Sequence, residues 1–189
     1  MTMELSFFKL VIWLCSTCLL ATGLPTTDND NTLSKRVILP EFTTCPHGFV
    51  RFADSCYKAA HDLANWPDAM VYCRAYASHL AYVETIDEQN FLTAHLRNIT
   101  ASITDPEKYF WIGGTDAVSE GEWIWSTVYR PITYTNWNPG EPNDNDSHSS
   151  KHQDCMGMYA ATGKWDDGWC ETLHNFICEM ELTDSEIVG

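Results

Sequence analysis

The residues with the clearest potential for chemistry lie in one short stretch, residues 138–146, which reads Asn-Pro-Gly-Glu-Pro-Asn-Asp-Asn-Asp. The stretch combines carboxylates and side-chain amides with prolines and a glycine, so it cannot form regular helix or strand. Oxygen atoms gathered in such a loop are the ligands that hard cations such as Ca²⁺ prefer. A solvated acidic turn is the alternative, and the loop by itself does not separate the two interpretations.

An N-terminal segment and the cysteines indicate the compartment. Residues 1–23 carry an apolar run followed by small residues, which predicts a secretory signal peptide cleaved after Gly23, with an uncleaved anchor as the alternative. No later stretch is apolar enough to cross a bilayer. An even number of cysteines in an oxidising compartment predicts disulfides, and spacing alone leaves every pairing open. The cysteines that remain after cleavage are Cys45, Cys56, Cys73, Cys155, Cys170 and Cys178.

The charge of the chain excludes one class of function. The formal net charge is −15 at pH 7. A chain this acidic is repelled by nucleic acid and by anionic lipid, whereas it attracts cations. We therefore exclude nucleic-acid binding. High solubility is the other explanation of the acidity, and it requires no ligand.

The elements that must position the acidic loop begin after a linker. Residues 24–44 lack periodicity and are rich in Thr, Asn, Asp and Pro, which predicts a flexible linker. Residues 45–58 contain two short apolar runs separated by turn residues and predict a hairpin. A first helix is expected from Trp66, with Ala69, Tyr72, Cys73, Tyr76 and Leu80 on its buried face.

A second helix and several strands follow. Thr85-Ile86-Asp87-Glu88 forms a capping box, and Asn98 is a glycosylation sequon at the end of the helix that the box starts. From residue 109 the pattern changes to short aromatic runs separated by tight turns. Two helices early and many short strands late predict an α+β domain. The expected strands lie within 109–114, 121–125, 134–137, 155–159, 164–170 and 174–179.

Taken together, these residues resemble the long-form C-type lectin domain. The resemblance rests on the cysteine positions and on Trp111-Ile112-Gly113-Gly114, Glu141-Pro142-Asn143 and Trp165-Asp166-Asp167. The resemblance covers residues 45–180 and leaves 181–189 as a short acidic tail. Within the family, the chain is most similar to the perlucin-type secreted lectins of invertebrates. It implies two helices, short antiparallel strands, a long calcium-binding loop region and chain ends that meet in one sheet. It also implies the disulfides Cys45–Cys56, Cys73–Cys178 and Cys155–Cys170.

The resemblance further implies two calcium sites, with Pro142 in the cis form. The principal site would consist of Glu141, Asn143, Gln153, Asp166 and Asp167, and all but Asp167 would also contact the sugar. The auxiliary site would consist of Asp116, Glu120, Asp144 and Asp154. In such lectins two neighbouring sugar hydroxyls bind the Ca²⁺ ion. Each hydroxyl also donates a hydrogen bond to a carboxylate that coordinates the ion and accepts one from an amide that coordinates it.

This chain departs from the family pattern at two of those positions. Gln153 stands where the family has a glutamate, and Asp166 stands where it has an asparagine. The exchange keeps the number of charged ligands unchanged. The Glu141–Asn143 order is similar to that of mannose-type lectins, whereas the Gln153–Asp166 pair is inverted. We therefore expect mannose-, fucose- or N-acetylglucosamine-type sugars, with galactose-type sugars as the alternative.

The expected function is that of a secreted, Ca²⁺-dependent lectin that binds cell-surface or microbial glycans, as in innate immunity. An enzyme is not expected, since the sequence has no Gly-x-Ser-x-Gly or His-Glu-x-x-His motif. One alternative is an acidic extracellular-matrix or calcium-carbonate biomineralisation protein. Another is a protein-binding domain whose calcium loop no longer functions.

Three smaller features remain open. His148 and His152 could share a Zn²⁺ ion with Asp154, although their polar, irregular setting favours solvated histidines. Asn145 begins a second sequon, where a glycan would crowd the expected site. No coiled-coil heptads precede the domain, so an oligomer would have to form through contacts between domains.

Overall fold

The structure is a computed structural model that describes residues 44–102, 108–144 and 152–182. The expected signal peptide, the linker up to residue 43, and both Asn145 and His148 lie outside these ranges. Every described residue falls in one compact unit, Ile38–Gly189. Within the described ranges, no helix has both the length and the apolar character that crossing a membrane requires.

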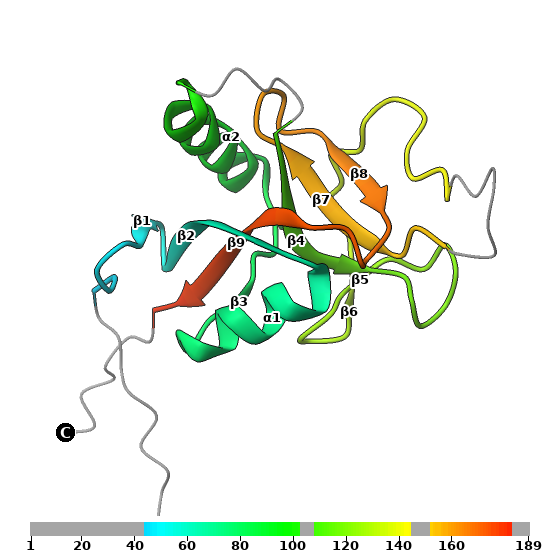
Figure 1. The fold of residues 1–189 in the computed structure, drawn as a ribbon, viewed down its shortest axis with the longest axis horizontal. Coiled ribbons are helices and arrows are strands. Elements are labelled where there is room, and N and C mark those ends of the chain that lie inside the picture. The colour runs from blue at the N-terminus through cyan, green and yellow to red at the C-terminus, as the bar shows by residue number, and fades with distance from the viewer. Residues whose placement is uncertain (1–43, 103–107, 145–151, 183–189) are drawn as a thin grey trace, which may run out of the picture. The chain divides into compact units, whose positions relative to one another are not determined.

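The described chain has helices early and most of its strands late, as predicted (Figure 1). The helices are α1 (Trp66–Ala75) and α2 (Ile86–Thr100). The strands are β1 (Val50–Phe52), β2 (Ser55–Ala64), β3 (His79–Leu80), β4 (Tyr109–Thr115), β5 (Ile124–Trp125), β6 (Arg130–Pro131), β7 (Cys155–Tyr159), β8 (Trp165–Gly168) and β9 (His174–Glu181).

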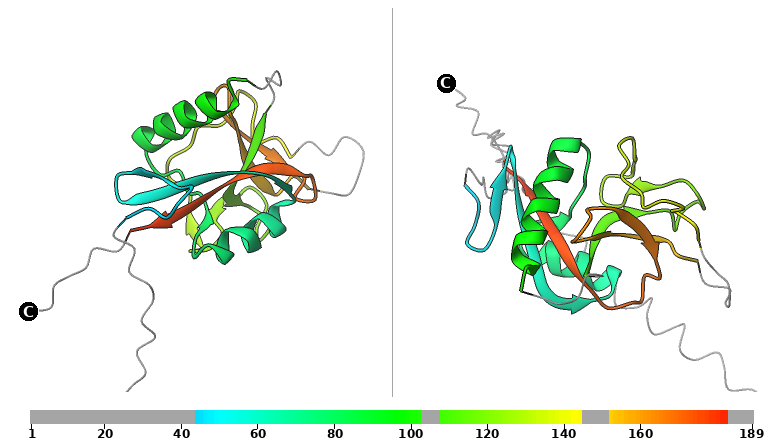
Figure 2. Two further views of the ribbon diagram at one scale, coloured as in Figure 1. Left: turned by 60° about the vertical axis from the view of Figure 1, so that its left-hand side comes forward. Right: turned by 90° about the horizontal axis from the view of Figure 1, so that it is seen from above.

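Strand β9 brings the two ends of the domain together. It pairs antiparallel with β2 and with β3, and parallel with β4. Strand β4 also pairs antiparallel with β7 along its other edge and with β5 at its C-terminal end, and β7 pairs with β8. Helices α1 and α2 lie on opposite sides of the β2–β9 pair (Figures 1 and 2). The α+β prediction and the meeting of the chain ends in one sheet are both confirmed.

Both helices begin where the sequence predicts, and each has a side-chain N-cap. The Asn65 side chain accepts a hydrogen bond from the Asp68 amide at 2.8 Å, and the Thr85 hydroxyl accepts one from the Glu88 amide at 3.2 Å. The Glu88 carboxylate accepts from the Glu84 amide at 2.8 Å, one residue before the N-cap. The predicted capping box is therefore present in a form that closes at Glu84.

The core is rich in aromatic side chains. Trp111, Trp125 and Trp165 are at most 1 % exposed, and the rings of Trp125 and Trp165 meet edge to face with centroids 6.1 Å apart. These side chains come from β4, β5 and β8, so the strands that adjoin the acidic loop are anchored in the core.

Two expectations about local structure are wrong. The sequence pattern places Tyr76 and Leu80 on the buried face of the first helix, but α1 ends at Ala75, so Tyr76 is 43 % exposed and Leu80 is buried as part of β3 instead. Residues 134–137 were expected to form a strand. They contribute only the isolated bridge between Trp137 and Trp165, because the chain there runs past the end of β8 rather than along a partner strand.

The disulfides join the pairs that the resemblance implies. They are Cys45–Cys56, Cys73–Cys178 and Cys155–Cys170. Cys155–Cys170 links the first residue of β7 to the turn that follows β8, so it fastens the hairpin that carries Asp166 and Asp167. The three disulfides of the predicted fold are thus confirmed.

Candidate functional site

The acidic loop is registered against β8 by its backbone. The Asn138 amide donates to the Trp165 carbonyl at 2.8 Å, and the Trp165 amide donates to the Asn136 carbonyl at 3.0 Å. The Glu141–Pro142 peptide bond is cis, as the resemblance implies, and Gly140 has φ +95°. The loop is therefore held beside the first residue of β8, directly before Asp166 and Asp167.

Three carboxylates meet at that point. Oxygens of Glu141, Asp166 and Asp167 all lie within 4.8 Å of one another. The Asp167 side chain is 4 % exposed and accepts from the Asn143 amide at 3.1 Å and from the Asp144 amide at 2.6 Å. Asp167 therefore connects β8 to the loop, and it aligns the loop ligands with those of the strand.

The two amide side chains expected at the principal site lie in the same place. Asn143 Nδ2 donates to Glu141 Oε1 at 2.8 Å, and Gln153 Nε2 donates to the Asp167 carbonyl at 3.3 Å. The structure thus brings together all five residues of the expected principal site. Their donor set, carboxylate and amide oxygens, is the set that Ca²⁺ prefers.

The electrostatics of this cluster also fit a cation. Burial, together with the nearby Asp167 and Asp166, raises the pKa of Glu141 to about 8. Burial likewise raises the pKa of Asp166, and the Tyr159 hydroxyl, which donates to Asp166 Oδ2 at 2.8 Å, opposes this. Among the described residues, Glu141 Oε2 is buried without a hydrogen-bond partner. A divalent ion would satisfy this oxygen and would relieve the repulsion between the carboxylates.

A second acidic cluster lies nearby and differs from the expected auxiliary site. It consists of Glu120, Asp144 and His152, whose ligand atoms lie within 4.8 Å of one another. His152 Nδ1 is 2.7 Å from Asp144 Oδ2 and 3.4 Å from Glu120 Oε2, and the bond to Asp144 raises the pKa of His152. Glu120 and Asp144 therefore meet as expected, with a histidine as their third member.

The other two residues expected at the auxiliary site lie close to each other but outside this cluster. Asp116 is 3 % exposed, and its Oδ2 accepts from the Gly121 amide at 3.0 Å. Asp154 contributes its backbone carbonyl, which accepts from the Thr115 hydroxyl at 2.6 Å and from the Asp116 amide at 3.3 Å. An ion bound by all four expected residues would need these side chains to move, so the auxiliary site stays a prediction.

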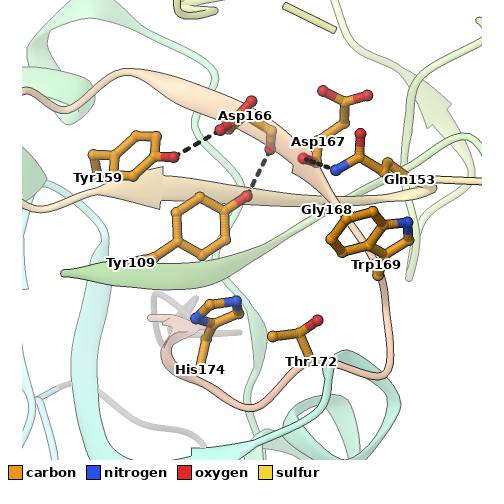
Figure 3. Close-up of a pocket in the computed structure, with 9 residues that line it drawn as sticks. All are labelled: Tyr109, Gln153, Tyr159, Asp166, Asp167, Gly168, Trp169, Thr172 and His174. Atoms are coloured by element: carbon orange, nitrogen blue, oxygen red, sulfur yellow. Dashed lines mark hydrogen bonds between the residues drawn. The ribbon is translucent and has the colours of Figure 1, made fainter. Parts of the chain in front are cut away.

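Sequence reasoning missed three contributors to these clusters. His152 was considered only with His148 as part of a zinc pair, although its place directly before Gln153 was a usable signal. Tyr109 and Tyr159 fall within the strands expected at 109–114 and 155–159, with no role predicted at the site. Their hydroxyls donate to the Asp166 carbonyl and to Asp166 Oδ2, both at 2.8 Å, and no sequence pattern indicated that (Figure 3).

Family comparison gives a clear match. Residues 62–180 match the model of the Lectin C-type domain. A C-type lectin mannose-binding isoform of Notechis scutatus scutatus is 34 % identical over 142 residues, which are 73 % of this chain and 84 % of the relative. Perlucin of Haliotis laevigata is 32 % identical over 139 residues, with 72 % of this chain and 84 % of that protein covered.

Human C-type lectin domain family 10 member A is 30 % identical over 142 residues, 75 % of this chain. The matched region spans only 42 % of the length of that human protein. The similarity therefore concerns one domain of it and does not extend to the remainder.

Solved structures of C-type lectin domains have a similar fold and agree with the family match. The mouse scavenger receptor C-type lectin carbohydrate-recognition domain superposes with a TM-score of 0.65 at 33 % identity, covering 74 % of this chain and all of that chain. The cow CD23 carbohydrate-recognition domain, determined in the presence of a GlcNAc2Man3 oligosaccharide, gives a TM-score of 0.63 at 32 % identity. That match covers 75 % of this chain and 98 % of the CD23 domain.

Proposed function

Because the chain belongs to the C-type lectin family, we propose that it is a secreted lectin whose sugar binding depends on Ca²⁺ held by Glu141, Asn143, Gln153, Asp166 and Asp167. Family membership supports a carbohydrate-binding protein rather than an enzyme. The calcium proposal is carried by the convergence of three carboxylates, one of which, Glu141, has a buried Oε2 without a hydrogen-bond partner in the described chain. When bound, the ion supplies coordination positions for sugar hydroxyls.

The side chains around that position then select the sugar by their hydrogen-bonding roles. Glu141 can only accept a hydrogen bond from a hydroxyl, whereas Asn143 can donate one to it. These two groups are adjacent, since Asn143 Nδ2 and Glu141 Oε1 are 2.8 Å apart. Gln153 and Asp166 offer the same two roles in the opposite order. We propose mannose-, fucose- or N-acetylglucosamine-type ligands on the basis of the Glu141–Asn143 pair, with galactose-type sugars as the alternative.

The proposal is tested by binding to a glycan array with Ca²⁺ and with EDTA. We expect neutral-sugar signals that EDTA abolishes, and we expect Glu141→Gln to remove them. Glu171→Gln is the matched control, because it removes one exposed carboxylate from the neighbouring turn and leaves the cluster intact. An array without any EDTA-sensitive signal from the natural chain would refute the proposal. The double variant Gln153→Glu, Asp166→Asn restores the family order and reports how far the inverted pair sets selectivity.

The net charge of −15 favours a second candidate, an acidic protein of an extracellular matrix or of calcium-carbonate mineral. The 32 % identity to perlucin is compatible with either role. Mineral adsorption would depend on diffuse surface charge, so excess monosaccharide would not compete and Glu141→Gln would have little effect. Competition by a monosaccharide supports glycan recognition, such as recognition of microbial surfaces in innate immunity.

Secretion and glycosylation are parts of the same proposal. Three disulfides are typical of proteins that fold in an oxidising compartment. Asn98 is exposed in the last turn of α2, where an N-glycan would be tolerated. Expression of the full chain in a secretory host, followed by mass spectrometry of the medium, checks cleavage after Gly23. Loss of mass on Asn98→Gln checks glycan attachment.

A further inference from the structure

A pocket of about 310 Å³ adjoins the proposed calcium site on one side of β8 (Figure 3). Gln153, Asp166 and Asp167 line it, so three of the proposed calcium ligands also form part of its wall. Its volume lies at the lower end of the range of small-molecule pockets, roughly 300–1,000 Å³. A ligand anchored at the calcium site therefore has an adjoining hollow large enough for one more small ring.

Trp169 provides a flat apolar surface at this pocket. It is 44 % exposed, whereas the other tryptophans in the described ranges are buried or half-buried. Figure 3 shows its ring on the side of the pocket opposite Tyr109 and Tyr159. An indole combines a large apolar face with one N–H donor. That combination suits a sugar ring, which has an apolar C–H face and a rim of hydroxyls.

The backbone at Trp169 is held by its neighbours. Its neighbour Cys170 is in the disulfide with Cys155, and the Cys170 carbonyl accepts from the Trp66 amide at 2.9 Å. The Thr172 amide donates to the Trp169 carbonyl at 2.9 Å and closes the turn. An aromatic side chain on a held backbone has only its two side-chain torsions to order on binding, which favours its use as a contact.

The remaining lining is polar and carries no positive charge. The Thr172 hydroxyl and the His174 imidazole face the pocket with the Tyr109 ring. His174 packs edge-on against Tyr109 with ring centroids 4.7 Å apart, and burial lowers its pKa, so the ring is neutral at pH 7 and offers one donor and one acceptor. The lining residues of the described chain include carboxylates but no lysine or arginine. This composition favours a neutral polyhydroxylated group over an acyl chain or an anion.

We propose that this pocket is a subsite for a second, neutral sugar residue, packed on Trp169, of a glycan whose terminal residue is held at the calcium site. The inference rests on the proposed function and deepens it. The preferred ligand is then a neutral oligosaccharide rather than a single sugar.

Isothermal titration calorimetry in the presence of Ca²⁺ tests the subsite. Each series compares a methyl monosaccharide with a neutral disaccharide that ends in the same sugar residue, and one series is built on mannose and the other on galactose. We expect the natural chain to bind the disaccharide roughly three- to tenfold more tightly in the series that it recognises, as stacking on one aromatic ring provides. Trp169→Ala is expected to abolish this gain and to leave monosaccharide affinity unchanged. Trp169→Tyr keeps an aromatic surface and is expected to keep part of the gain. Leu173→Ala, at a side chain that is 58 % exposed and outside the pocket, is the control.

The outcomes separate the subsite from the function on which it rests. Equal affinity for the two sugars in the natural chain, or an equal loss of both in Trp169→Ala, would refute the subsite while calcium-dependent binding stands. Failure of the natural chain to bind any monosaccharide or disaccharide of either series in Ca²⁺ would refute the proposed function and the subsite with it. Tighter binding of a sialylated or sulfated disaccharide than of its neutral counterpart would contradict the choice of a neutral occupant.

Discussion

Tyr57, Glu88 and Glu179 form a buried group whose protons link stability to pH. The Tyr57 hydroxyl lies 2.6 Å from Glu88 Oε1 and 3.1 Å from Glu179 Oε1, and the three residues are 2 %, 8 % and 6 % exposed. The hydroxyl has one proton, so it can donate to only one carboxylate at a time. A proton on Glu88 would make both contacts hydrogen bonds. Burial, with repulsion from Glu179, raises the pKa of Glu88 to about 7.

The sign of the pH effect follows from this pKa. In the unfolded chain Glu88 titrates near its ordinary value of 4.5, so between that pH and about 7 the folded state binds more protons. Stability therefore falls as pH rises through this window, and the loss is complete above pH 7. At about 1.4 kcal/mol per pKa unit the shift gives an upper value near 3.5 kcal/mol, and partial access of water lowers it, so we expect about 1–3 kcal/mol.

Glu88→Gln should remove this dependence. The amide NH₂ gives Tyr57 a permanent donor, the amide oxygen can accept from the Glu84 amide, and Tyr57 remains free to donate to Glu179. Relative to the natural chain, the variant is expected to gain about 1–3 kcal/mol at pH 8 and almost nothing at pH 5. Urea denaturation at both pH values, in EDTA so that no calcium contributes, measures the difference.

Glu181→Gln is the matched control for this experiment. Glu181 lines the same pocket as Glu88 but is exposed, so its replacement should change stability little at either pH. The reasoning would be refuted if Glu88→Gln changed stability equally at pH 5 and pH 8, or if it destabilised the protein at pH 8.

Two further predictions concern the residues behind the calcium site. Tyr159→Phe removes the hydroxyl that donates to Asp166 Oδ2, so Asp166 is expected to protonate more readily. Ca²⁺ affinity is then expected to fall on the order of fivefold at pH 6, with a smaller loss at pH 8. Calcium titrations at the two pH values measure this, and an equal loss at both would contradict it. Gly157→Ala places a Cβ in the space of the Tyr109 ring, and the free energy of unfolding measured in urea is expected to fall by about 2 kcal/mol, because overpacking forces that ring away from the Asp166 carbonyl. Val118→Ala, at a side chain that is 72 % exposed, is the control. If Gly157→Ala is as stable as the natural chain, the ring moves without cost and the prediction is wrong.

Much of the fold could be predicted because its signals are local. The caps at Asn65 and Thr85 are side chains that bond an amide three residues ahead, so a single sequence displays both partners. The early helices and later strands were visible in the same way. The errors at Tyr76 and at residues 134–137 arose where neighbouring elements, rather than local pattern, decide where a helix stops and whether a strand has a partner.

The disulfides and the principal site could be predicted from the family resemblance, although not from local pattern alone. Spacing left every cysteine pairing open, and only the combined motifs of the C-type lectin domain implied the pairs that the structure contains. Glu141 and Asp166 are separated by a long stretch of chain, so their convergence could be expected from the resemblance but not from local pattern.

The sequence by itself determined which groups are available: an acidic loop broken by prolines, a pair of aspartates after Trp165, and the amide of Gln153 shortly after the loop. These are properties of residue type and short spacing, which folding does not change. Only the tertiary structure decided which groups meet. In the folded chain His152 lies beside Asp144, and one oxygen of Asp166 accepts a hydrogen bond from Tyr159. Trp169 is exposed at the edge of a pocket. Each of these contacts depends on the register of β7 and β8 and on how the loops pack against them, because the partners come from segments that adopt their relative positions only on folding.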